Sequence, residues 1–260
     1  MLKLTDVTIA YKNVPVVKNF NLDMRSGQIV SLVGESGSGK TTVIRAILGL
    51  LPGGGKVVGG QILFEGTDLL SYTQNQWRKL RGSEISMIFQ DSGAMMNPTK
   101  KIGHIFTEYI LTHEKISKKE AWNKGIRMLE RMRLPSADHI MDSYSFQLSG
   151  GMRQRVGIAM GMTYQPKLLL ADEPTSALDV TTQAQIVRQM VQLRNNYHTG
   201  ILMVTHNLGV AAYMSDYLIV MKNGKIEDQG TREYILNSSV NEYTKKLLKA
   251  VPSLGGERYV

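Results

Sequence analysis

The stretch that decides the fold is Gly34-Glu35-Ser36-Gly37-Ser38-Gly39-Lys40-Thr41, in which three glycines precede a lysine and a threonine. It matches the pattern G-x-x-x-x-G-K-[ST], which indicates a phosphate-binding loop when a strand precedes it and a helix follows it. Residues 28–33 form an apolar run that predicts the strand. Residues 41–50 have the apolar spacing of a helix and are followed by Pro52. The sequence therefore predicts a site for phosphate groups.

Each part of this loop has a predicted role in binding a triphosphate and its metal ion. The glycines let the backbone wrap closely, so that amide hydrogens point toward phosphate oxygens. A helix that begins near Lys40 adds a partial positive charge at its N-terminus. Lys40 is expected to reach the β- and γ-phosphates, and the Thr41 hydroxyl is expected to ligate Mg²⁺. The residues of this stretch predicted to bind the nucleotide are Gly34, Ser36, Gly37, Ser38, Gly39, Lys40, Thr41 and Thr42.

Two carboxylates follow a second apolar run. Leu168-Leu169-Leu170-Ala171 is predicted to be a buried strand, and Asp172 and Glu173 come directly after it. Buried unpaired charge is unfavourable, so such groups are expected at the exposed carboxyl edge of the sheet. There Asp172 is predicted to hold Mg²⁺, usually through water. Glu173 is predicted to accept a proton from an attacking water molecule.

Strand and helix patterns alternate along most of the chain. Apolar runs at 59–64, 85–89, 201–205 and 218–221 predict strands, and the amphipathic stretch 181–196 predicts a helix. This alternation indicates an α/β fold with a mainly parallel, doubly wound sheet. Residues 1–25 predict short strands with a turn at Asn13 and Pro15, residues 103–142 predict a helical insert, and the tail after Gly230 is predicted to be mostly helical.

Composition narrows the class of protein. The chain has 260 residues, 42% of them hydrophobic, and no cysteine, which excludes disulfides, iron–sulfur clusters and thiolate zinc sites. No apolar run approaches the ~20 residues of a membrane span, and no secretory signal is recognisable, so a cytoplasmic protein is expected. The net charge of +9 is scattered along the chain. It favours a solvated basic surface, with an anionic membrane face as the second reading and nucleic acid as the third.

Further motifs make the pattern specific to one family. Leu148-Ser149-Gly150-Gly151-Met152-Arg153-Gln154-Arg155 resembles the signature motif of ATP-binding cassette (ABC) proteins. The segment from Glu173 to Asp179 resembles the acidic motif of that family where it runs into the D-loop. Four single residues also resemble family positions. Gln90 resembles the Q-loop glutamine and His206 the switch histidine. Tyr11 resembles the aromatic that stacks on adenine, and Asp179 the D-loop aspartate.

The resemblance implies a fold and a mechanism. It implies a P-loop NTPase (RecA-like) core with an antiparallel β subdomain and a helical insert subdomain. The expected division is 1–90 and 151–230 for the core, 91–150 for the helical subdomain and 231–260 for a helical tail. ATP and Mg²⁺ are the implied ligands, with Gln90 and His206 near the γ-phosphate and Gln90 at the metal. Two subunits are expected head to tail, so that Ser149, Gly150 and Gly151 of one face the γ-phosphate bound by the other.

Several segments resemble the peptide and nickel importer branch of the family. They are residues 85–91 with Asn97-Pro98, the Gly-Gly-Met form of the signature, and the tail from Tyr243 to Pro252. The implied partners are a second, related ATPase subunit, two transmembrane permease subunits and an extracytoplasmic solute-binding protein, with this chain peripheral on the cytoplasmic face of a bacterial membrane. Residues 91–96 differ from the usual sequence of this branch. The resemblance places this segment beside the groove where a membrane subunit docks. Longer members of the peptide type carry a cysteine-rich C-terminal extension, which is not found in the sequence up to Val260. The nickel or metallophore type is therefore slightly favoured over the peptide type.

Two other functions remain as alternatives. A soluble ABC ATPase acting on nucleic acid or on the ribosome would need coiled-coil, zinc or second-cassette insertions, and none is recognisable in the sequence. An exporter cassette is disfavoured because its membrane spans are commonly fused to the ATPase. The transported substrate, peptide or nickel chelate, belongs to the permease and binding protein rather than to this chain.

Overall fold

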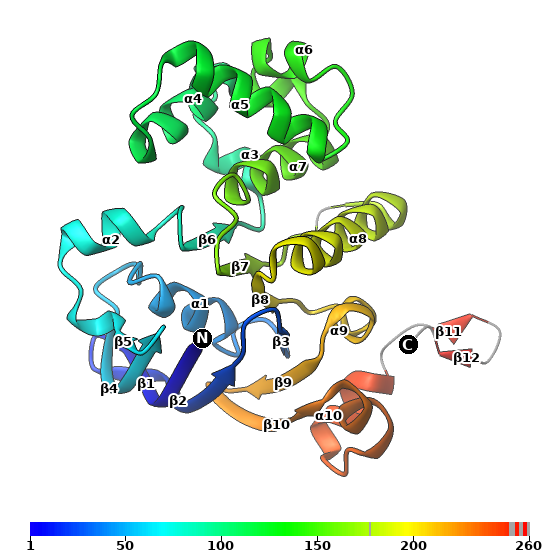
Figure 1. The fold of residues 1–260 in the computed structure, drawn as a ribbon. Coiled ribbons are helices and arrows are strands. Elements are labelled where there is room, and N and C mark those ends of the chain that lie inside the picture. The colour runs from blue at the N-terminus through cyan, green and yellow to red at the C-terminus, as the bar shows by residue number, and fades with distance from the viewer. Residues whose placement is uncertain (177, 250–252, 255–256, 259–260) are drawn as a thin grey trace.

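A six-stranded sheet forms the centre of the fold (Figure 1). The computed structural model describes residues 1–176, 178–249, 253–254 and 257–258. The sheet has the order β10-β9-β3-β8-β7-β6, and every neighbouring pair is parallel except β9 and β10. Its strands are β3 (Ile29–Val33), β6 (Ile85–Ile88), β7 (Leu168–Asp172), β8 (Gly200–Val204), β9 (Tyr217–Lys222) and β10 (Lys225–Thr231). All residues of β3, β7 and β8 are buried, as expected for parallel strands covered on both faces.

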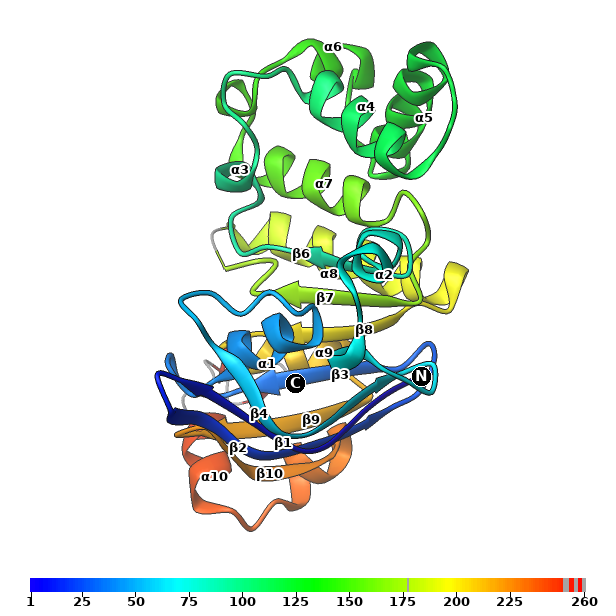
Figure 2. The ribbon, with the colours of Figure 1, turned by 90° about the vertical axis from the view of Figure 1, so that its left-hand side faces the viewer.

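A second, antiparallel sheet packs on one side of the first (Figure 2). It has the order β2-β1-β4-β5, with β1 (Leu2–Tyr11), β2 (Val14–Met24), β4 (Lys56–Phe64) and β5 (Thr67–Asp68). Helix α1 (Lys40–Ile47) lies between the two sheets, and its buried Val43, Ile44 and Ile47 belong to the core that both sheets share. The helix that follows the phosphate loop is therefore held from both sides.

The turn between β1 and β2 differs from the prediction. Lys12 and Asn13 form it, both with positive φ (47° and 66°), and Pro15 lies inside β2 instead of in the turn. Positive φ at both central residues is the geometry of the tight hairpin turn that matches strand twist. Proline is tolerated in β2 because β2 is an edge strand of its sheet, where a missing backbone N–H need not break the ladder.

Helices form a layer beyond the β6 edge of the large sheet, drawn in green in Figures 1 and 2. They are α3 (Ser92–Met95), α4 (Ile102–His113), α5 (Lys118–Arg131), α6 (Ala137–Asp142) and α7 (Gly150–Gly161). The helical insert predicted for 103–142 is confirmed. α5 begins with a capping box, in which Ser117 and Glu120 exchange side-chain to backbone hydrogen bonds. The shorter elements are η1 (Leu69–Ser71) and α2 (Gln74–Leu80), which lie between β5 and β6 in the chain, and η2 (Ser145–Gln147), which lies between α6 and α7.

The tail packs under the β10 edge. α8 (Val180–Tyr197) and α9 (Leu208–Met214) precede it, and it contains η3 (Tyr234–Ser238), α10 (Glu242–Lys249), β11 (Ser253–Leu254) and β12 (Glu257–Arg258). The prediction of a mostly helical tail holds as far as Lys249, whereas β11 and β12 pair as strands. Val251 and Pro252 of the predicted tail motif, and Ala177 of the predicted acidic motif, lie outside the described residues.

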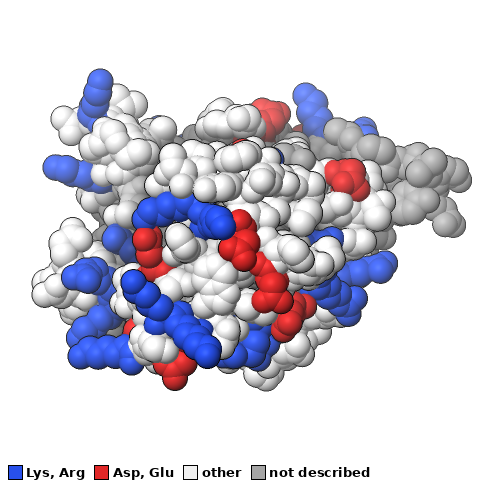
Figure 3. Space-filling view, turned by 90° about the horizontal axis from the view of Figure 1, so that it is seen from above, with Lys and Arg blue, Asp and Glu red and all other residues white. Residues whose placement is uncertain are grey.

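Charge on the face above α4, α5 and α6 is mixed. Figure 3 shows basic and acidic side chains interspersed there, without a single-sign stripe. Ion pairs join Lys100 to Glu108 and Lys101 to Asp142 in this layer. On this face the structure thus agrees with a solvated surface more than with a nucleic-acid footprint. Among the described residues, no helix combines the length and apolar character that crossing a bilayer requires.

Candidate functional site

The phosphate loop joins the end of β3 to the start of α1, as the sequence predicts. Gly34 has φ 144°, and a Cβ there would lie 2.1 Å from the carbonyl oxygen of Met221, so only glycine fits. Gly39 has φ 100° at the N-cap of α1, and a Cβ there would lie 2.9 Å from Cγ2 of Val17. The loop therefore runs close to β9 and β2, which fixes its path.

Lys40 is almost fully enclosed by this loop. Its side chain curls back, and Nζ donates to the carbonyl oxygens of Gly34 and Glu35, both at 2.7 Å, and to Oγ of Ser38 at 3.2 Å. Burial lowers the pKa of Lys40, while the carboxylates of Glu173, Asp172 and Glu35 oppose that shift. The ammonium group is thus held at the centre of the loop.

The end of β7 brings a carboxylate to the start of α1. The Thr41 hydroxyl donates to Oδ1 of Asp172 at 2.8 Å, although the two residues are far apart in sequence. Burial raises the pKa of Asp172, and the hydrogen bond from Thr41 opposes this shift. A hydroxyl and a carboxylate oxygen are the hard ligands that Mg²⁺ prefers, and Mg²⁺ commonly takes few protein ligands beside substrate phosphates. The donor set therefore fits Mg²⁺, and no cluster of three acidic or histidine ligands is present among the described residues.

Glu173 lies where three strand ends meet. Its φ of 45° is unusual for a residue with a side chain, and its N–H donates to the carbonyl oxygen of Val204 at 2.9 Å. Oε2 of Glu173 accepts from Nε2 of Gln90 and lies near Nδ1 of His206, both at 3.2 Å. β6, β7 and β8 are neighbours in the sheet, so residues predicted separately from three strand ends converge on one carboxylate. The bond from Nε2 leaves Oε1 of Gln90 as the atom that could ligate a metal ion.

Sequence reasoning missed a residue that holds the Gln90 loop. Gln154 of α7 is only 4% exposed. Its Nε2 donates to the carbonyl oxygen of Phe89 at 3.3 Å, and its Oε1 accepts from the N–H of Ser92 at 3.4 Å. Gln154 therefore bonds the loop on both sides of Gln90 and ties it to the signature helix. Its position inside the signature motif was the only available signal, and that signal does not reveal the partner.

The signature turn lies at the start of α7. Ser149 is its N-cap, with Oγ accepting from the N–H of Met152 at 3.3 Å. A Cβ on Gly151 would lie 2.6 Å from Cγ2 of Thr182, so the glycine permits close packing on the start of α8. Asp179 caps α8 by accepting from the N–H of Thr182 at 2.9 Å, and hydrogen bonds from Thr182 lower its pKa. Gly150 lies between Ser149 and Gly151 in the same turn, and no hydrogen bond among the described residues joins this turn to the Lys40 loop.

The other predicted nucleotide contacts lie around the loop. Ser36 and Gly37 form its exposed tip, and Thr42 is half-buried on α1. Tyr11 ends β1, and its ring covers Gly55, where a Cβ would lie 2.6 Å from Cε1. The structure thus places Tyr11 on the antiparallel sheet, and its stacking on adenine stays a prediction.

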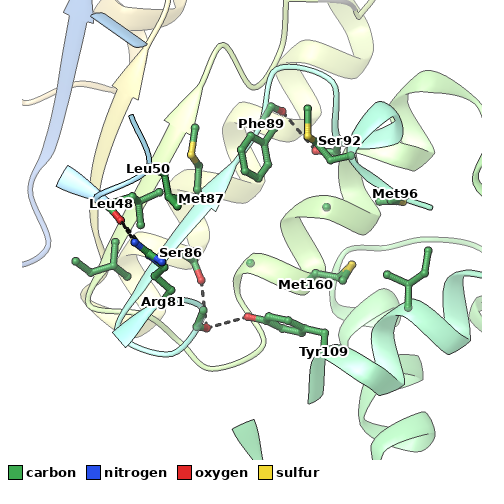
Figure 4. Close-up of a pocket in the computed structure, with 16 residues that line it drawn as sticks. Leu48, Leu50, Arg81, Ser86, Met87, Phe89, Ser92, Met96, Tyr109 and Met160 are labelled. Carbon is green, nitrogen blue, oxygen red and sulfur yellow. Dashed lines mark hydrogen bonds between the residues drawn. The ribbon is translucent and has the colours of Figure 1, made fainter. Parts of the chain in front are cut away.

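An apolar groove lies between the large sheet and the helical layer (Figure 4). Its volume is about 300 Å³, and it borders the 91–96 segment that departs from the family pattern. At one end Arg81 donates to the carbonyl oxygen of Leu48, and Tyr109 donates to that of Gly82 at 2.8 Å. Phe89 and Met96 lie toward the other end, and Met95 and Met160 also line the groove. Met95 is 63% exposed, so one apolar side chain of the groove lining is open to solvent.

The fold and the site together define a P-loop ATPase with an inserted helical layer. Comparison with known families is consistent with this class: the family described as "ABC transporter" matches residues 17–176. The chain therefore belongs to the ABC transporter family, and it is an ATPase of that family.

Curated relatives and solved structures narrow the comparison. The oligopeptide transport ATP-binding protein AppD of Bacillus subtilis is 42% identical over 245 residues, covering 94% of this chain and 75% of AppD. The oligopeptide transport ATP-binding protein OppD of Escherichia coli is 40% identical over 261 residues, covering 99% of this chain and 77% of OppD. Among solved structures, the dimeric bacterial ABC transporter cassette MJ0796 has a TM-score of 0.80 at 28% identity and covers 89% of this chain and 99% of its own. MJ0796 has also been solved in a dimeric post-hydrolysis state bound to ADP and Pi.

Proposed function

We propose that this chain is the ATP-hydrolysing subunit of an importer for peptides, located on the cytoplasmic face of the membrane. The proposal is supported by relatives named for oligopeptide and dipeptide transport that match 93–99% of the chain. The sequence slightly favoured nickel or a metal chelate, and we rank that substrate class second because these relatives are named for peptide transport. A soluble ATPase acting on nucleic acid or the ribosome is not favoured by these relatives or by the mixed charge in Figure 3.

The observation that carries the proposed chemistry is the environment of Glu173. Its carboxylate lies between the Gln90 amide and the His206 ring, at the same sheet edge as Lys40 and Asp172. Glu173 accepts a proton from water while the water oxygen bonds to the γ-phosphorus and the bond to the ADP oxygen breaks. Lys40 would bind the β- and γ-phosphate oxygens, and Asp172 and Thr41 would hold Mg²⁺. Mg²⁺, when bound, neutralises charge that develops on the phosphate oxygens.

A second ATPase subunit completes the proposed site. The Ser149 turn presents the N-terminus of a twelve-residue helix, and such an end favours an anion. No hydrogen bond among the described residues connects this turn to the Lys40 loop of the same chain. A head-to-tail pair therefore places the Ser149 turn of one subunit on the γ-phosphate held by the other. We also propose that the chain divides at residues 90, 150 and 230 into the core, helical subdomain and tail predicted from the sequence.

We assign the groove beside Met95 to a segment of a permease subunit. The groove is lined mostly by apolar side chains and borders the Gln90 loop, so a docked segment would touch the element that carries Gln90. Gln154 ties the same loop to the signature helix. Permease movement and the geometry around Glu173 would then be coupled through one loop. The proposed assembly comprises this chain, a second ATPase, two permease subunits and an extracytoplasmic binding protein.

A competition uptake assay tests the substrate. The assembled transporter is placed in proteoliposomes with ATP inside, and uptake of a labelled short peptide is measured. Unlabelled peptides are expected to compete, and nickel salts are not. The Glu173→Gln transporter, which retains the groove and the loop, is the matched control and should show no ATP-driven uptake. Absence of labelled-peptide uptake, together with ATP-driven uptake of labelled nickel or its chelate, would replace the peptide proposal with its alternative.

A further inference from the structure

The tail helix α10 contacts the phosphate loop directly. Tyr243 is 8% exposed, and its hydroxyl oxygen accepts a hydrogen bond from the N–H of Glu35 at 3.2 Å. Glu35 is the second residue of the loop, whereas Tyr243 lies 208 positions further along the chain. Removing that acceptor would leave a partly buried N–H without its protein partner.

The same loop residue holds Lys40. The carbonyl oxygen of Glu35 accepts from Nζ of Lys40 at 2.7 Å, so the tail on one side and the ammonium group on the other both bind Glu35. Val33, directly before Gly34, shares an apolar cluster with Tyr243 and Leu248.

Local bonds fix the position of Tyr243. Oδ1 of Asn241 accepts from the N–H groups of Tyr243 and Thr244 at 2.9 and 3.0 Å, which caps the start of α10. Thr244 is fully buried and donates to Oδ2 of Asp228 on β10 at 2.9 Å. Nζ of Lys222 lies 4.6 Å from the centroid of the Tyr243 ring, a cation–π contact. These contacts hold the phenol in place in addition to its hydrogen bond with the loop.

We propose that Tyr243 is a positioning residue of the ATP site, through which the tail helix fixes the backbone around Glu35 and so the arrangement of Lys40. The inference rests on ATP binding as proposed above. Tyr243 touches no phosphate; it acts through Glu35. Loss of one such hydrogen bond predicts roughly twofold to tenfold weaker nucleotide binding, with little change in the rate of the bound complex.

The test uses the full chain with Tyr243→Phe, which removes only the hydroxyl. Tyr213→Phe is the matched control, because Tyr213 is 61% exposed on α9, away from the loop. Binding of a fluorescent ATP analogue with Mg²⁺ is measured on the chain, and KM and kcat are measured on the assembled transporter that contains it. The expected result is a raised Kd and KM at near-normal kcat for Tyr243→Phe, and no change for Tyr213→Phe. Equal Kd values for wild type and Tyr243→Phe would overturn the inference, whereas a wild type that binds no nucleotide would instead refute the proposed function.

A second measurement needs no variant. Coupling between two sites is reciprocal, so nucleotide binding should slow hydrogen exchange in residues 241–249 of the wild-type chain. Residues 118–131, which form α5 in the helical layer, are the internal control and should not change. Unchanged exchange in 241–249 at saturating nucleotide would contradict the inference even if Tyr243→Phe folds poorly.

Discussion

Replacing Glu173 with Gln isolates the proposed general base. Gln has nearly the same size and keeps a carbonyl oxygen that can accept from Nε2 of Gln90, now at 3.2 Å from the carboxylate. The backbone contact of residue 173 with Val204 is unaffected, because it uses the main-chain N–H. What the substitution removes is the negative charge and the ability to take a proton from water.

The magnitudes separate loss of the base from loss of a contact. General base catalysis contributes about 10²–10⁴ in rate, or roughly 3–5 kcal/mol of barrier. Loss of a hydrogen bond is worth about 0.5–1.5 kcal/mol between neutral groups and about 1.5–3 kcal/mol when one group is charged. Gln at position 173 keeps an oxygen that can accept from Nε2 of Gln90, so the substitution weakens the contacts with Gln90 and His206 instead of leaving them without an acceptor, and the loss of the base is the larger effect. We therefore expect ATP turnover to fall by at least about a hundredfold while ATP still binds.

Phosphate release by the assembled transporter is the assay, with binding of a fluorescent ATP analogue measured in parallel. Glu84→Gln is the matched control: Glu84 is a 44% exposed carboxylate paired with Lys167 at 2.9 Å, remote from the Lys40 loop. Turnover should be unchanged in this control. If Glu173→Gln hydrolyses ATP within tenfold of the wild type, Glu173 is not the base and the proposed chemistry is refuted.

Two further outcomes are expected. Burial lowers the pKa of His113 below its ordinary value of 6.5, with Glu114 opposing the shift, so the unfolded chain binds the proton more readily. His113 therefore contributes stability above pH ~6.5 that is lost as the pH falls through its lowered folded-state pKa. Unfolding by urea at about pH 7.5 and about pH 5 should show a smaller acid loss for His113→Gln than for wild type or His139→Gln, and an equal loss would contradict the assignment. Met95→Glu should abolish copurification with the permease subunits while ATP binding persists, because it places a charge in the apolar groove. Val58→Glu, at an exposed apolar residue of β4, is the control and should copurify normally. Normal copurification of Met95→Glu would exclude the groove as the docking site for the permease.

Local sequence predicted those parts of the site that are contiguous in the chain. The Lys40 loop and the Asp172-Glu173 pair each combine a recognisable strand with special residues at its end. In a parallel sheet the carboxyl ends of neighbouring strands share one edge, so their convergence follows from topology. Most predicted strands and helices were confirmed. The strands predicted to be short within residues 1–25 are instead the long β1 and β2, and β4 begins at Lys56, three residues before the predicted start.

Long-range packing explains what the sequence could not predict. Gln154 meets Phe89 and Ser92 only because α7 packs against the short helix after β6. Tyr243 reaches Glu35 only because the tail returns beneath the sheet edge at β10. Neither residue carries a local pattern that identifies its partner. The placement of Pro15 in β2 likewise depends on which strand becomes the sheet edge, which local propensity does not specify.

The central claim is that one triphosphate is bound by two subunits, through Lys40 of one and the Ser149 turn of its partner. A structure of the Glu173→Gln chain, assembled with its ATPase partner and saturated with Mg²⁺ and ATP, tests it directly. The account predicts the γ-phosphate between Lys40 of one subunit and a signature turn of the other, within hydrogen-bond distance of both. A triphosphate that contacts Lys40 while both signature turns remain far from any phosphate would contradict it.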